Sequence, residues 1–116
     1  MAVAVAELWT DAERAAWAPP QRIAVSEWAT QHRMIVAKDA AEPGRWRHER
    51  APYLREIMDA LGPDDPVEEI VIIKASRVGG TEVLRTALAY WIDQDPGPAL
   101  VVYPNEQTAE EQIVKE

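Results

Sequence analysis

The residues from Lys74 to Thr81, KASRVGGT, are of the types that bind phosphate in nucleotide-binding proteins. In the usual phosphate-binding loop, G-x-x-x-x-G-K-[ST], glycine lets the backbone amides approach the phosphates, lysine reaches the β- and γ-phosphates and a hydroxyl binds Mg²⁺. Gly79 and Thr81 stand where that pattern requires a glycine and a hydroxyl. The loop also precedes a predicted helix, whose free amides and dipole favour an anion. The sequence therefore predicts a phosphate site at this loop.

The loop departs from the usual pattern at two positions. Lys74 replaces the first glycine, and Gly80 occupies the usual lysine position. Lys74 could compensate by reaching back over the loop, and Arg77 is a second candidate for the missing cation. A plain strand-to-helix turn with a solvated lysine and arginine is the alternative. In that case Thr81 caps the helix, and Glu82 is a first-turn acid that the helix dipole favours.

Two apolar segments flank the loop and its helix. Residues 67–73 end in the run Ile70–Ile73, which is typical of a central parallel strand covered on both faces. Residues 99–103 form a second apolar strand, and residues 81–92 are the predicted helix between the two, in a right-handed βαβ unit. Because two strands alone are marginal in water, we expect further strands. A last helix, predicted from Asn105 to Glu116, reaches the end of the chain, so we interpret the chain as part of a longer protein.

Three short helices are predicted before the first strand, at residues 6–17, 26–34 and 52–61. Thr10 and Glu13 match a capping box at the first helix, and Ser26 is expected to cap the second. The third has apolar side chains at helical spacing, and Gly62 suits a left-handed cap at its end. Residues 37–50 show no apolar period and are expected to be irregular.

The composition is that of one ordinary globular domain. The 116 residues are 47% hydrophobic, and the absence of cysteine excludes disulfides, thiolate metal sites and cysteine nucleophiles. The net charge of -8 argues against a protein that coats DNA.

The chain also contains a basic cluster. It either is solvated or faces DNA phosphates, and it consists of Arg45, Arg47, Arg50 and Arg55. Because no apolar run has membrane length and no basic leader is evident, we expect a soluble cytoplasmic protein that is neither secreted nor membrane-bound.

Several separate motifs resemble the lambda-type large terminase subunit of tailed bacteriophages. They are EPGRWR at 42–47, PYLREIMDAL at 52–61, KASRVGGTE at 74–82, VSEWA at 25–29, DPGP at 95–98, LVV at 100–102 and Pro104. The resemblance covers residues 22–116, and residues 1–21 are left as an N-terminal arm without resemblance. The family carries the lysine of its phosphate loop at the start, a position that falls on Lys74.

The resemblance implies an α/β fold: part of a P-loop NTPase, with a parallel sheet and flanking helices as in the RecA-like ATPase core, preceded by short helices. It implies ATP and Mg²⁺ as cofactors. Members of the family are oligomeric motors in the host cytoplasm that pack double-stranded DNA into a preformed capsid. They act with a small terminase subunit and the capsid portal, and cut DNA with a C-terminal nuclease domain. The Walker B strand, coupling motif and nuclease carboxylates lie outside the 116 residues, so this chain alone is expected to be inactive or nearly so.

The resemblance also assigns roles to individual residues. The expected nucleotide-binding residues of the loop are Lys74, Ala75, Ser76, Arg77, Val78, Gly79, Gly80 and Thr81. Lys74 is expected to neutralise phosphate charge, Arg77 to support it in catalysis and Thr81 to bind Mg²⁺. Trp46 or Tyr53 could stack on adenine beside Arg50, although a tyrosine on a helix is more often a core residue. The alternatives are another P-loop ATPase, such as a helicase, or a non-catalytic prophage remnant.

Overall fold

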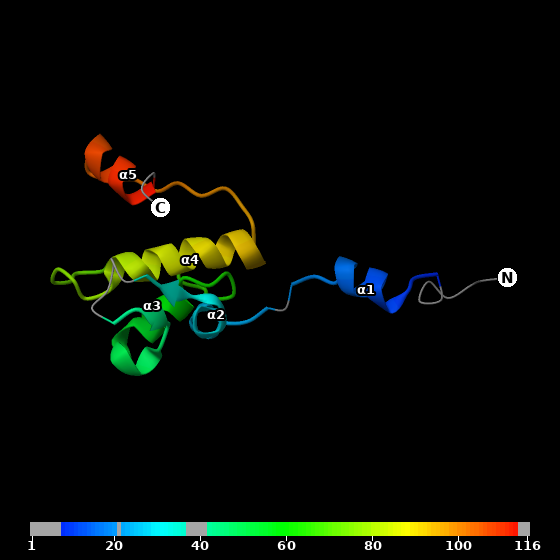
Figure 1. Cartoon of the computed structure of the whole chain (residues 1–116). Coiled ribbons are helices and arrows are strands. Elements are labelled where there is room, and N and C mark those ends of the chain that lie inside the picture. Colours follow the sequence, from blue (N-terminus) through cyan, green and yellow to red (C-terminus); the bar gives the residue numbers. More distant parts are fainter. Residues whose placement is uncertain (1–7, 21, 37–41, 114–116) are drawn as a thin grey trace.

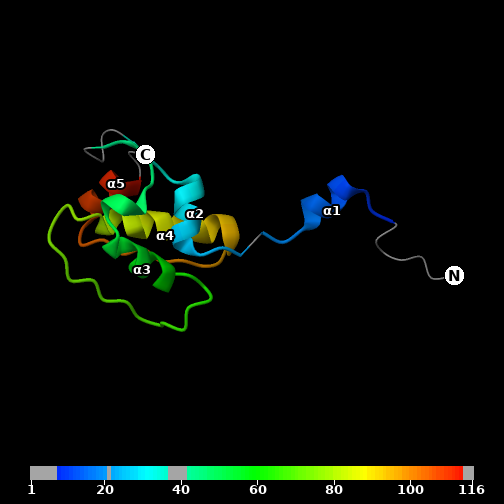
Figure 2. The ribbon, with the colours of Figure 1, turned by 90° about the horizontal axis from the view of Figure 1, so that it is seen from below.

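The computed structural model describes residues 8–20, 22–36 and 42–113 (Figure 1). Its elements are α1 (Asp11–Trp17), α2 (Val25–His32), β1 (Met34–Ile35), β2 (Gly44–Arg45), the short 3₁₀ helix η2 (His48–Arg50), α3 (Tyr53–Ala60), α4 (Gly80–Gln94) and α5 (Glu106–Ile113). α1 projects away from the body of the molecule, in which α2 and α3 pack against α4 (Figure 2). The loop of interest leads directly into α4, so the packing of α4 determines where that loop lies.

The core lies between α2, α3 and α4. Its buried apolar residues are Val25, Trp28, Ala29, Trp46, Leu54, Met58, Val83, Ala87 and Tyr90. Two long-range hydrogen bonds tie α4 to the chain around α2: the Tyr90 hydroxyl donates to the Ile23 carbonyl oxygen at 2.8 Å, and Trp28 Nε1 donates to Asp93 Oδ2 at 2.8 Å. Hydrogen bonds from Gln94 and from Trp28 lower the pKa of Asp93, so this acceptor stays ionised at neutral pH. The C-terminal part of α4 is therefore tied to the chain around α2.

The predicted helices form, with corrections at their ends. The capping box of α1 is confirmed, because the Glu13 amide donates to Thr10 Oγ1 at 3.2 Å and the Thr10 amide donates to Glu13 Oε2 at 2.8 Å.

Two other predicted caps are wrong. Ser26 does not cap α2, because Ala24 is the N-cap and Ser26 lies buried inside the helix. The expected cap on Gly62 is also wrong. Its amide continues a right-handed turn by donating to the Asp59 carbonyl at 3.0 Å, without a positive φ.

Residues 37–50 are more ordered than expected where the structure describes them. β1 and β2 form an antiparallel pair, with Met34 opposite Arg45 and Ile35 opposite Gly44. η2 follows, while residues 37–41, which were expected to be irregular, lie outside the described part.

The predicted last helix begins near Asn105, whose Oδ1 accepts from the Thr108 amide at 2.8 Å. It is described to Ile113, and the expected extension to Glu116 falls outside the described residues.

The predicted parallel sheet does not form in this structure. Within the described ranges, the one sheet is the β1–β2 pair, and residues 67–73 and 99–103 are extended without ladder hydrogen bonds. The physical reason is that neither segment has a neighbouring strand. The side chains of Ile73 and Leu100 are accordingly 96% and 88% exposed, whereas a central strand would bury them. The helix predicted between the two segments thus forms as α4, whereas the parallel sheet of the expected α/β fold is not seen.

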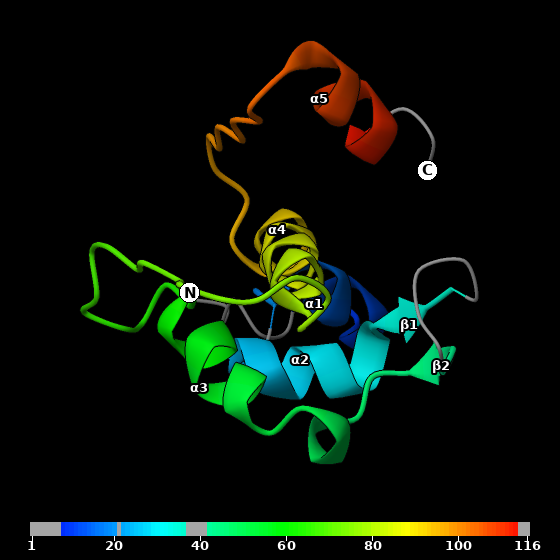
Figure 3. The same ribbon diagram turned by 90° about the vertical axis from the view of Figure 1, so that its left-hand side faces the viewer.

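The two extended segments lie on different parts of the surface around α4. α5 and the segment that precedes it lie on the side of α4 opposite α2 and α3 (Figure 3). An open cleft of about 530 Å³ lies between residues 60–70 and residues 91–99, where the two extended segments begin. Across the described part of the chain, no helix combines the length and the apolar character that a membrane crossing requires.

Candidate nucleotide-binding site

The loop from Lys74 to Thr81 makes a sharp left-handed turn before α4. Arg77 has φ +60° and Gly79 has φ +92°, and Gly79 is the N-cap of the helix. A methyl group on Gly79 would lie 2.7 Å from Leu54 Cδ1 of α3. The positive φ therefore favours glycine here, and any side chain at this position would also displace Leu54 of α3.

The N-terminus of α4 presents free amide groups. Its first backbone hydrogen bond runs from the Val83 amide to the Gly79 carbonyl at 3.1 Å, and no side chain caps it. Among the residues that the structure describes, the amides of Gly80, Thr81 and Glu82 have no acceptor. Together with the positive end of the helix dipole, these donors suit an anion.

Lys74 lies over the loop. This is the position in which it could compensate for the missing lysine at position 80. A Cβ on Gly80 would overlap Lys74 Cε and would lie 2.5 Å from Lys74 Cδ, so the lysine stem occupies the space where a side chain at position 80 would start. The ammonium group lies 3.5 Å from the Ala75 carbonyl oxygen. In the described part of the chain no carboxylate pairs with Lys74, so its charge is available to a ligand.

The remaining predicted loop residues are open to solvent. Ala75, Ser76, Arg77 and Thr81 are exposed, and Val78 is half-buried. The Thr81 side chain does not cap α4, because the cap is Gly79. The cap that was the alternative for Thr81 is therefore not seen, and its contact with Mg²⁺ stays a prediction. The described residues include no group of three or more His, Cys, Asp or Glu side chains that could hold a metal.

The structure separates the two candidates for stacking on adenine. Trp46 is only 6% exposed and packs in the core, with Nε1 donating to His48 Nδ1 at 3.2 Å, so a base has no access to it. Tyr53 is 58% exposed at the start of α3, and its hydroxyl donates to the Val78 carbonyl oxygen in the loop at 3.0 Å. Arg50, expected to line the same pocket, pairs with Glu42 at 2.6 Å.

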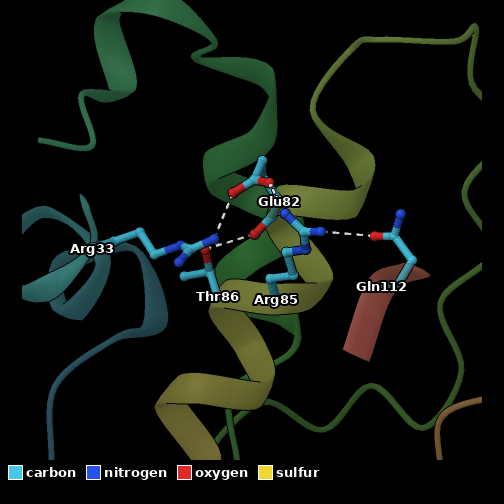
Figure 4. A network of polar contacts seen from close by, with 5 residues as sticks. All are labelled: Arg33, Glu82, Arg85, Thr86 and Gln112. Atoms are coloured by element: carbon cyan, nitrogen blue, oxygen red, sulfur yellow. Dashed lines mark hydrogen bonds and ion pairs between the residues drawn. The ribbon is translucent and has the colours of Figure 1, made fainter. Parts of the chain in front are cut away.

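A polar network beside the loop was not predicted from the sequence. The Glu82 carboxylate accepts from Arg33 at 2.6 Å and from Arg85 at 2.9 Å, and Arg85 also donates to Gln112 of α5 at 2.8 Å (Figure 4). The Glu82 side chain is only 16% exposed. The network joins α4 to Arg33, the residue after α2, and to α5. The sequence offered only the i,i+3 spacing of Glu82 and Arg85 as a signal, because Arg33 lies far away along the chain.

Comparison with known proteins places the chain in a family. Residues 40–116 match the family described as phage terminase large subunit gpA, ATPase domain. The chain belongs to this family. It is 33% identical over 97 residues to the terminase large subunit of Escherichia phage lambda, and 30% identical over 92 residues to that of Enterobacteria phage P21. These alignments cover 84% and 79% of the chain and 14% of each terminase large subunit. No solved structure matches the chain.

Proposed function

We propose that this chain is the ATP-binding portion of a phage DNA-packaging motor. Membership of the terminase ATPase family supports a nucleotide-handling role. The observation that carries the proposal is the position of Lys74, whose stem lies against Gly80 beside the free amides of α4. A cation in this place meets the requirement that the usual loop meets with its lysine.

Each loop residue has a definite task in this proposal. Lys74 neutralises the charge of the β- and γ-phosphates, and Arg77 supports the charge that develops during phosphoryl transfer. The amides from Gly79 to Glu82 cradle the phosphates. Thr81 contributes its hydroxyl to Mg²⁺, which supplies the remaining charge neutralisation when it is bound. The exposed loop, its free amides and its unpaired lysine fit such a ligand.

The complete packaging activity that we propose needs more than these 116 residues. The chain spans 14% of the length of the two terminase large subunits, so hydrolysis, DNA translocation and DNA cutting require parts that lie outside it. We place the N-terminal part of the ATPase domain at residues 22–116 and leave residues 1–21 as an arm. Double-stranded DNA, a small terminase subunit and the capsid portal are the proposed partners of the whole oligomeric protein. The family match disfavours a helicase.

The test is ATP binding by the full-length gene product with Lys74→Ala. Because a hydrogen bond to a charged group contributes about 1.5–3 kcal/mol, the substitution should weaken Mg·ATP binding about ten- to hundredfold, measured by titration calorimetry. Arg14→Ala on α1 is the control, because it removes one positive charge far from the loop and should leave the affinity unchanged. Equal affinity of the wild type and Lys74→Ala would contradict the role of Lys74. No ATP binding by the wild type would favour a non-catalytic remnant.

A further inference from the structure

The hydroxyl of Tyr53 holds one particular peptide group of the phosphate loop. It donates to the Val78 carbonyl oxygen at 3.0 Å, while the next residue of α3, Leu54, packs against Gly79. Tyr53 is 58% exposed, so burial contributes little to its placement. The first turn of α3 thus contacts the loop at two consecutive residues, Val78 and Gly79.

The held peptide group is followed by a glycine. It joins Val78 to Gly79, between the left-handed residues Arg77 (φ +60°) and Gly79 (φ +92°). Glycine adopts positive and negative φ with similar ease, so rotation of this peptide has little steric hindrance on the glycine side. The hydrogen bond from Tyr53 selects one of the available orientations.

That orientation matters for an anion. A trans peptide is planar, so the Val78 carbonyl and the Gly79 amide point in opposite directions. With the carbonyl turned toward Tyr53, the Gly79 N–H points away from α3. A rotated peptide would instead turn a carbonyl oxygen, which carries partial negative charge, to the side where the amide now points. Phosphate binding requires the first orientation and is opposed by the second.

We propose that Tyr53 is a positioning residue of the phosphate loop, and that it sets the affinity for the triphosphate without selecting the base. This inference rests on the proposed function, because it concerns the same site. It is offered in place of stacking on adenine, because the contact of Tyr53 with the loop is made by its hydroxyl. It also assigns the specific contribution to the hydroxyl, so the ring alone does not suffice.

The experiment compares Tyr53→Phe with Tyr90→Phe in the full-length gene product. Both substitutions delete a hydroxyl that donates to a backbone carbonyl, but the bond of Tyr90 to Ile23 lies in the core away from the loop. The probes are Mg·ATP, Mg·GTP and inorganic tripolyphosphate. Because a neutral hydrogen bond contributes modestly, Tyr53→Phe should weaken binding of all three about two- to tenfold, with the ATP-to-GTP ratio unchanged. Tyr90→Phe should lower the melting temperature and leave the three affinities unchanged.

Other outcomes separate the two proposals. Unchanged tripolyphosphate affinity in Tyr53→Phe overturns the positioning role. If Tyr53→Phe binds normally while Tyr53→Leu loses ATP relative to tripolyphosphate, the ring stacks on the base, and the positioning role is again overturned. In both cases wild-type binding that depends on Lys74 leaves the proposed function intact. If the wild type binds none of the three probes, the proposed function and the role of Tyr53 are overturned together.

Discussion

Lys74 and Gly80 share one space in the phosphate loop. The lysine stem passes where the first side-chain atom of a residue at position 80 would lie, so a side chain there would require Lys74 to move from its present position. The departure from the usual pattern at Gly80 is therefore linked to the departure at Lys74. A loop with lysines at both positions would force one of them out of place.

This link predicts a rescue at the residue scale. Gly80→Lys alone should not improve Mg·ATP affinity, because the new side chain collides with Lys74. In the Lys74→Ala background the same change should recover most of the lost affinity, about tenfold or more, because it restores a cation at the usual position. Titration of the full-length gene product with Mg·ATP measures both effects.

The matched control is Lys74→Ala with Gly80→Ala, which adds the Cβ without the charge and should not recover affinity. A gain in affinity from Gly80→Lys alone would mean that Lys74 does not serve the phosphates in the native loop. Absence of rescue in the double variant would mean that position 80 cannot reach them.

Much of the candidate site could be predicted at this scale, because the loop is a contiguous motif. The positions of Gly79, Lys74 and Thr81 relative to the helix follow from their spacing. The Tyr53 hydrogen bond and the Arg33–Glu82 pair could not be predicted, because each joins residues that are distant in sequence. Trp46 shows the opposite error: its type suggested stacking on a base, but the packing of α2 and α3 buries it.

At the scale of elements, α4 is fixed at both ends by polar contacts to α2 and its neighbours. Near its N-terminus, Glu82 accepts from Arg33, which directly follows α2, and near its C-terminus Asp93 accepts from Trp28. Helices could be predicted because their apolar period and caps are local, as the capping box of Thr10 shows. Strands could not, because β-branched segments such as residues 67–73 become strands only when a neighbour pairs with them.

The Glu82 network predicts a stability effect at the scale of α2, α4 and α5. Glu82→Ala leaves Arg33 and Arg85, both mostly buried, without their shared carboxylate, and should lower the free energy of unfolding by about 2 kcal/mol. Urea denaturation followed by far-UV circular dichroism measures this decrease in the free energy of unfolding. Glu27→Ala is the control, because Glu27 is likewise an acid in the first turn of its helix but is exposed.

The control should lose only about 0.3–1 kcal/mol, the contribution of an exposed acid at a helix N-terminus. The Glu82→Ala, Arg33→Ala double variant should lose less than the sum of the single losses, because the two residues are partners. Additive losses, or equal losses for Glu82→Ala and Glu27→Ala, would show that the network does not stabilise the junction.

At the scale of the whole molecule, the chain holds the loop and the crossover helix but not the sheet that would cover them. Leu84 and Ile92 of α4 are exposed, as are Val71 and Ile73 before the loop and Leu100 and Val102 after the helix. Apolar side chains in extended segments on both sides of one helix are what a parallel sheet buries. Since the chain spans 14% of the length of its relatives, we propose that strands from the rest of the ATPase domain pair with these segments.

Ile73→Ser tests this proposal, because its cost depends on whether the sheet is present. In the 116-residue chain by itself, Ile73 is 96% exposed, so the substitution should change the free energy of unfolding by no more than about 0.5 kcal/mol. In the full-length gene product, where we expect Ile73 to lie in a buried strand, the substitution should lower the free energy of unfolding by about 2 kcal/mol or more. Leu8→Ser, exposed and outside the residues that match the family, should cost little in both proteins. Equally small losses for Ile73→Ser in the two proteins would show that residues 67–73 remain uncovered.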